Sequence, residues 1–282
     1  MSRNLRAFSG FCLLALCIWL LGCSSSGPQQ VQPGSPEYFW LGAKRAYDNG
    51  EYLDASEKLA KITSSDNSFR VRAEVGLMVL SSGLAQGYME MADAYELGAR
   101  TSPENRAAFH GQVSAMRNQA KANLMQFVEC VHYFTEHKSD QPVPFEFGPP
   151  AGSAAESAAV VKIGKGAALS PAEADSALKG LLQKGVLQAV SKAIGASDPA
   201  KSADMLKQQP LQLQRGVIFE AQAAALHEQS QLFGPRKLDE PVKLKTLCGE
   251  ALEILSQIPD SKTNKDLQAK IQKTMKGPKP VS

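Results

Sequence analysis

The sequence predicts an all-α protein, and three observations lead to that class. Alanine, leucine, glutamine, lysine and glutamate are abundant after the first 22 residues, and β-branched runs are few. Apolar residues recur at spacings of three and four along most of the chain. Serine–proline and glycine signals bracket these segments. We expect helical hairpins, stacked as an α-solenoid or gathered in an irregular bundle.

The first segment, residues 1–22, predicts a secretory signal peptide. Arg3 and Arg6 precede an apolar run of eleven residues, 11–21. A helix that crosses a bilayer needs about 20 such residues, so this run is too short to span a membrane. A basic head, a short apolar middle and an exit of small residues are typical of a secretory signal.

The exit of this segment reads Leu20-Leu21-Gly22-Cys23 and resembles the cleavage site of bacterial lipoproteins. The resemblance implies cleavage before Cys23, a diacylglycerol on its sulfur and an acyl chain, such as palmitate, on the new amino terminus. Several acyl chains anchor a protein firmly where one is marginal. The residue after the cysteine is Ser24 and not an aspartate. By the same resemblance, this implies that the protein is anchored in the outer membrane and faces the periplasm. The alternative to lipidation is an ordinary secreted protein with a chance cysteine. The alternative to the outer membrane is the inner membrane.

Residues 23–36 are rich in serine, proline and glutamine and predict a flexible tether. A helical domain is expected over 37–137. Ser35-Pro36 predicts a helix start, because serine caps and proline suits the first turn. Asn49-Gly50 ends this helix, and a second one follows to about Ile62, which makes a helical hairpin.

The same plan is expected to repeat after Phe69, with a helix that breaks near Gly87. "GEYLDA" at 50–55 and "GYMEMA" at 87–92 lie 37 residues apart. With Gly50, Tyr52 and Ala55 in place, these hairpins resemble the tetratricopeptide repeat, a helical hairpin of about 34 residues. An alanine-rich helical bundle is the alternative.

The resemblance also implies a partner surface. Stacked hairpins expose the first helix of each pair, so Phe39, Trp40 and Tyr47 are the expected contact with a protein partner, together with the stretch 71–80. The register departs from the family in two places, because "WLG" at 40–42 is shifted and Leu80 stands where a small residue is expected.

A single long helix is expected from Ser102 to about His137, and a Pro/Gly/Ala-rich crossing loop over 138–169. A short helix is possible near the end of that loop. Phe145 and Phe147 within it either pin the loop to the core or offer an exposed apolar contact. We favour pinning.

A second helical region that packs on the first is expected over 170–276. Ser170 with Glu173 predicts a capping box. Further helices are expected from Pro199 to Gly234, broken at Pro210, and over 242–258. The last segment has a narrow apolar face that suits a capping helix at the end of a stack. Residues 277–282 are expected to form a disordered tail.

Two cysteines, Cys130 and Cys248, remain after the signal and Cys23. In an oxidising compartment they either pair or stay as buried free thiols. Both lie in apolar contexts on separate expected helices, and a disulfide needs Cα atoms within about 7 Å. We favour free thiols.

One constellation has a metal-ligand spacing, namely Glu129-x-x-His132 followed by Glu136. Residues three apart share a helix face. Di-iron bundles need two such motifs on facing helices, and the chain has one, so a polar helix edge is the favoured interpretation. The sequence also lacks a phosphate-binding loop, a nucleophile elbow and a Cys-x-x-Cys pair. No catalytic residue, cofactor or metal is therefore expected.

Charge excludes one class of partner. Removal of the signal would lower the formal net charge from +3 to +1, which leaves no electrostatic footprint for nucleic acid. The favoured expectation is a membrane-anchored, non-enzymatic periplasmic lipoprotein that serves a protein partner as scaffold or adaptor. The alternative is a ligand-binding lipoprotein associated with solute transport, which would have an apolar cavity between its helices.

Overall fold

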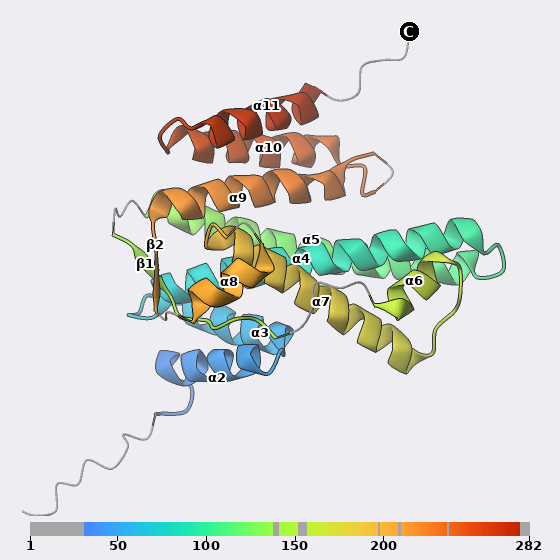
Figure 1. Cartoon of the computed structure of the whole chain (residues 1–282), viewed down its shortest axis with the longest axis horizontal. Helices are drawn as coiled ribbons and strands as arrows, with labels where there is room; N and C mark the ends of the chain where they lie inside the picture. The colour runs from blue at the N-terminus through green and yellow to red at the C-terminus, as the bar shows by residue number, and fades with distance from the viewer. Residues whose placement is uncertain are drawn as a thin grey trace, which may run out of the picture.

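The computed structural model describes residues 31–137, 141–151, 157–196, 198–207, 210–235 and 237–276. Several expected features lie outside the described residues: the signal peptide, the expected lipidation at Cys23, most of the tether and the tail 277–282. The predicted all-α class is confirmed, because the described elements are helices apart from one small two-stranded sheet (Figure 1).

The elements follow one another in a simple order. They are α2 (Pro36–Asp48), α3 (Tyr52–Thr63), α4 (Arg70–Thr101), α5 (Arg106–Glu136), β1 (Val143–Phe145), α6 (Ala158–Gly164), α7 (Pro171–Ala193), α8 (Pro199–Leu206), β2 (Leu211–Leu213), α9 (Arg215–Ser230), the 3-10 turn η1 (Gln231–Phe233), α10 (Pro241–Ser256) and α11 (Lys262–Lys276).

The helices are stacked from α2 at one end to α11 at the other (Figure 1). α2 packs on α3 and α3 on α4, which lies between the two long helices α5 and α7. α9 lies beside this layer, and α10 and α11 follow it in the stack. The ends of the described chain therefore lie on opposite sides of the molecule.

The first hairpin forms as the sequence predicts. The Ser35 hydroxyl accepts a hydrogen bond from the Tyr38 backbone N–H at 3.1 Å, and Pro36 is the first helical residue. Gly50 adopts a positive φ of 76° between the helices, a conformation that glycine takes without steric cost.

The expected second hairpin is wrong. α4 runs without a break through Gly87 and is 32 residues long. A Cβ atom at Gly87 would lie 2.7 Å from the Leu181 carbonyl oxygen of α7, and one at Gly83 would lie 2.6 Å from the Val186 Cα. The glycines therefore let α4 and α7 approach closely where they cross, and they do not mark a turn.

The long helix before residue 137 is confirmed as α5, which returns along α4. The capping box at the start of α7 is also confirmed, because the Ser170 hydroxyl accepts from the Glu173 N–H and the Glu173 carboxylate accepts from the Ser170 N–H.

A second small core, where Tyr95, Phe109 and Ile163 meet, closes the tip of the α4–α5 hairpin beneath α6.

The crossing segment is tied down at both of its phenylalanines. β1 pairs antiparallel with β2, with Val143 opposite Leu213 and Phe145 opposite Leu211. Phe145 and Phe147 are each 2% exposed, so the predicted pinning is confirmed. The sequence did not predict the sheet, which occupies the break expected at Pro210.

None of the helices in the described ranges combines the length and the apolar character needed to cross a bilayer.

Candidate functional site

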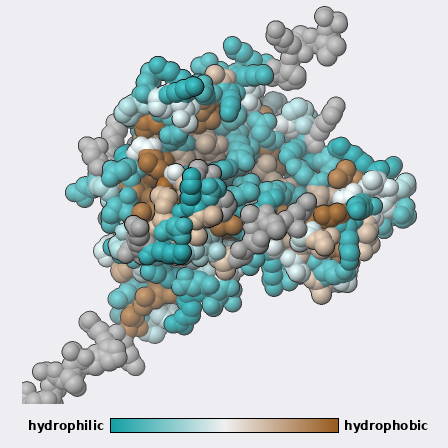
Figure 2. All heavy atoms as spheres, viewed as in Figure 1, coloured by the Kyte–Doolittle hydropathy of each residue, from teal (hydrophilic) through white to brown (hydrophobic). Residues whose placement is uncertain are grey.

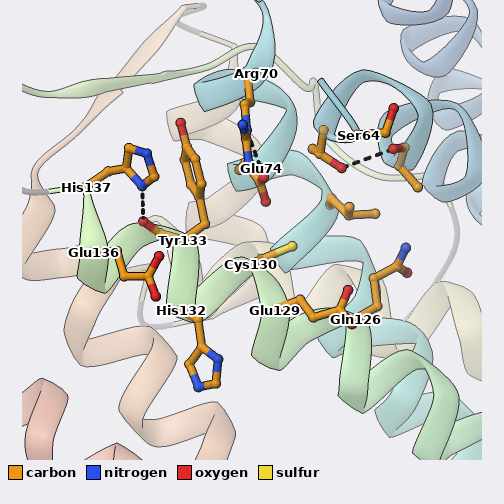
Figure 3. A pocket seen from close by; sticks show the side chains of 13 residues that line it. Ser64, Arg70, Glu74, Gln126, Glu129, Cys130, His132, Tyr133, Glu136 and His137 are labelled. Atoms are coloured by element: carbon orange, nitrogen blue, oxygen red, sulfur yellow. Dashed lines mark hydrogen bonds and ion pairs between the residues drawn. The ribbon is translucent and has the colours of Figure 1, made fainter. Parts of the chain in front are cut away.

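A polar groove of about 510 Å³ lies where the end of α3, the start of α4 and the last turns of α5 meet (Figure 3). It is lined by Ala60, Thr63 and Ser64 from α3 and its C-cap, by Arg70, Glu74 and Leu77 from α4, and by Gln126, Glu129, Cys130, His132, Tyr133, Glu136 and His137 from α5 and its C-cap.

Side-chain hydrogen bonds fix the helix ends around this groove. Asn67 donates from Nδ2 to the Ile62 carbonyl at 2.9 Å and accepts the Phe69 N–H at Oδ1, also at 2.9 Å. These bonds close α3 and start α4. On the other wall, Arg215 of α9 donates to the Phe134 carbonyl at 2.6 Å, which satisfies the end of α5.

Glu74 forms the floor of the groove. The residue is 5% exposed, and the Cys130 thiol of α5 hydrogen-bonds to its carboxylate. Burial raises the pKa of Glu74, while the bond from Cys130 and the nearby charge of Arg70 lower it in part. Burial and the Glu74 charge also raise the pKa of Cys130. The thiol therefore stays protonated near neutral pH and is not an activated nucleophile.

A stack of three side chains forms one wall. The Arg70 guanidinium lies 4.6 Å from the centre of the Tyr133 ring, and its Nε lies 3.6 Å from a Glu74 carboxylate oxygen. The Tyr133 ring stacks on His137, with ring centres 4.0 Å apart. His137 is held in turn, because its Nδ1 donates to the Tyr133 carbonyl at 2.9 Å. Arg70 is thus already occupied by Glu74 and Tyr133.

Two carboxylates remain on the rim. Glu129 and Glu136 are exposed and lie seven residues apart on α5, about 10 Å along the helix. Within the described ranges, neither has an ion-pair partner. The groove therefore has an excess of negative charge and suits a cationic group.

The predicted metal-ligand spacing is not assembled into one cluster. Figure 3 shows His132 pointing away from Glu74 and the groove floor. The His132 Nε2 lies 3.6 Å from the Glu250 carboxylate of α10. Among the residues that the structure describes, no group of three or more His, Cys, Asp or Glu side chains is arranged to hold a metal ion.

The expected partner surface at Phe39, Trp40 and Tyr47 is wrong. Trp40 is 4% and Tyr47 1% exposed, and Phe39 is half-buried against the core. The crossing segment covers them, since the Phe147 ring centre lies 5.4 Å from that of Trp40 and 4.8 Å from that of Tyr47. The Tyr47 hydroxyl also donates to the Gly148 carbonyl at 3.0 Å.

Most of the expected surface stretch 71–80 is buried as well. Val71 is exposed, but Ala73 to Leu80 are buried between α3, α5 and α7. These positions serve the core of a bundle whose central helix is α4, which is why no open first-helix face remains there.

Cys130 and Cys248 are both buried free thiols, as favoured from the sequence. Cys130 faces Glu74 across the α4–α5 contact. Cys248 of α10 lies 3.4 Å from the Ser230 hydroxyl.

Sequence reasoning missed Arg70 and Glu74, which form the centre of the groove. The run from Ala73 to Leu80 is apolar except for Glu74. A carboxylate inside a continuous apolar run predicts a buried charge with a specific partner. That signal is present in the sequence. Arg70 can be the partner because it stands four residues before Glu74, and residues i and i+4 share a helix face.

The chain is thus an all-α protein, and an acidic groove lies among the depressions on the part of its surface that the structure describes. Comparison with protein-family models, with curated proteins and with solved structures finds no match to the chain.

Proposed function

We propose that this chain is a lipid-anchored, non-enzymatic protein of the bacterial envelope that holds a protein partner, and that a basic segment of the partner binds in the acidic groove. The carrying observation is the pair of rim carboxylates, Glu129 and Glu136, above a floor where Glu74 forms an ion pair with Arg70. A lysine or arginine of the partner would find two free carboxylates at the rim.

The anchoring part of the proposal is supported by the Leu20-Leu21-Gly22-Cys23 sequence. Eleven residues, or twelve Cα–Cα steps, separate Cys23 from the N-cap Ser35 of α2. Such a segment reaches at most about 40 Å, which would keep the helical stack beside the membrane surface. The outer membrane, with the protein in the periplasm, is the proposed location.

Chemistry at the groove is not part of the proposal. Burial keeps the thiol of the groove, Cys130, protonated. The buried carboxylate of the groove, Glu74, interacts with the Cys130 thiol and forms an ion pair with Arg70. An adaptor needs only a shaped, charged surface, and helical stacks are well suited to that role.

The alternative, a subunit that binds a solute in an apolar cavity, has weaker support. The hollow between α4, α5, α7 and α9, beside Gln222, has a volume of about 20 Å³, which is room for about one water. A second pocket, of about 270 Å³, lies beside Val143 and Ile218. Small-molecule sites usually have about 300–1,000 Å³, so both volumes fall below that range. A depression of about 660 Å³ beside Tyr52 reaches that range, but exposed residues such as Glu51 and Lys179 line it, so it is not an apolar cavity between helices.

Site-specific crosslinking in cells tests this proposal. A photoreactive residue in place of Ser64, which is exposed and lines the groove, should give a crosslinked protein product. The same residue in place of Gln119, exposed elsewhere on α5, is the matched control and should give none. Equal products at both positions, or none at Ser64, would refute the groove as the partner site.

A further inference from the structure

The outermost helix, α11, presents an unusually basic face. Its inner side packs on the stack through Ile271, which is fully buried, with Leu267 and Met275 beside it. Five lysines and one aspartate give the helix a formal charge of +4, against +3 for the whole chain. The positive charge of the protein is therefore concentrated at this end of the stack (Figure 1).

Four of the lysines form one line, which we call the lysine stripe: Lys262, Lys265, Lys273 and Lys276. All four are exposed. At 100° per residue they fall within a sector of about 80°, and they extend over about 21 Å of helix. The surface over α11 is mainly hydrophilic in Figure 2.

Ion pairing distinguishes this face from that of α7, another helix with several lysines. On α7, Lys179, Lys184 and Lys192 each pair with a carboxylate. In the lysine stripe, Lys265 pairs with Asp260 at 3.2 Å, but both side chains are well exposed, so that pair is weak. Within the described part of the chain, Lys262, Lys273 and Lys276 have no ion pair.

We infer that the lysine stripe is a docking surface for phosphate-bearing, anionic lipid at a bilayer surface. The argument is charge complementarity: a line of four lysines, three of them without an ion pair, matches a plane of phosphates. Each lysine near such a surface contributes about 1 kcal/mol of attraction, or roughly fivefold in affinity. Neither arginine nor any large apolar side chain lies in the stripe.

That composition argues against a protein partner at this face. Protein interfaces gain their affinity from buried aromatic or arginine anchors, and lysine is depleted in them. A lipid surface needs no such anchor, because lysines bind phosphates as mobile point charges. The inference stands apart from the proposed groove, since the groove and α11 share no residues.

Lysine acetylation on vesicles tests the inference with the full chain. The protein is reconstituted on vesicles that contain phosphatidylglycerol or only phosphatidylcholine, and its presence on both is measured by flotation. Acetylation rates are then read residue by residue by mass spectrometry. The stripe lysines should react at least about fivefold more slowly on the anionic vesicles, and high salt should remove this protection.

Two triple variants make the result specific. In Lys262→Gln/Lys273→Gln/Lys276→Gln, the remaining Lys265 should react equally fast on both kinds of vesicle. In the matched control, Lys179→Gln/Lys184→Gln/Lys192→Gln, the stripe should stay protected. Equal rates for the unchanged protein on both vesicles would overturn the inference, as would protection that appears only when an acidic protein is added.

Discussion

At the scale of single residues, Glu74 is the most informative side chain of the groove. It is a carboxylate surrounded by apolar residues of α4, and burial raises its pKa. A raised folded-state pKa means that the folded protein holds this proton more tightly than the unfolded chain. Stability from this group is therefore complete below the unfolded pKa of about 4.3 and is lost as pH rises through the folded-state pKa.

This gives a prediction for Glu74→Gln. The amide cannot ionise. As pH rises from about 4 to neutral, the free energy of unfolding of the variant should therefore increase relative to that of the unchanged protein. Urea unfolding at a series of pH values measures the difference. Glu253→Gln, exposed on α10, is the control and should show no such trend. Parallel pH profiles for Glu74→Gln and the unchanged protein would contradict the buried-charge account.

The sequence predicts a residue's role correctly where its contacts lie a few residues away, and wrongly where they lie far along the chain. Ser35 and Ser170 were identified as caps because a cap and its N–H partner lie within three residues. Trp40 and Tyr47 were assigned to a partner surface because nothing near them in sequence showed that Phe147, about 100 residues later, would cover them.

At the scale of elements, the crossing of α4 and α7 organises the molecule. Gly83 on α4 and Gly185 on α7 lie in contact, and a Cβ atom at either would meet the backbone of the other helix. Local sequence cannot separate a glycine that ends a helix from one that admits a neighbour. Gly87 predicts a turn for this reason, because its neighbour Leu181 is 94 residues away in the sequence.

The crossing leads to a prediction with an internal control. Gly185→Ala places a methyl group against the Gly83 carbonyl oxygen, so it should lower the free energy of unfolding by about 1–3 kcal/mol or more. Gly180→Ala, on the same helix, meets no atom within 4 Å and should raise it by about 0.5–1 kcal/mol. Denaturant unfolding measures both. Equal effects at the two positions would contradict the close crossing.

At the scale of the whole molecule, the stack has two distinct ends. The proposed lipid anchor precedes α2, while the lysine stripe lies on α11 at the far end (Figure 1). The acidic groove lies between them, on α3, α4 and α5. Sequence alone predicted the helical class and the proposed anchor, but the groove required the tertiary packing of three helices.

The anchor carries its own prediction. Cys23→Ser removes the sulfur that would accept the diacylglycerol, so the variant should leave the membrane fraction or remain as an unprocessed precursor. Cell fractionation followed by mass measurement distinguishes these outcomes. Cys130→Ser serves as the control, because that buried thiol lies in the folded stack. A Cys23→Ser protein that stays membrane-bound at the processed mass would contradict lipidation at this residue.

The central claim is that the acidic rim of the groove holds a basic partner segment, and charge reversal tests it most directly. With the photoreactive residue at position 64, Glu129→Lys/Glu136→Lys should reduce the yield of crosslinked partner by at least about tenfold, because like charges then face each other. Glu57→Lys/Glu253→Lys, which reverses two exposed carboxylates elsewhere, should leave the yield unchanged. An undiminished yield with the rim reversed would contradict the claim.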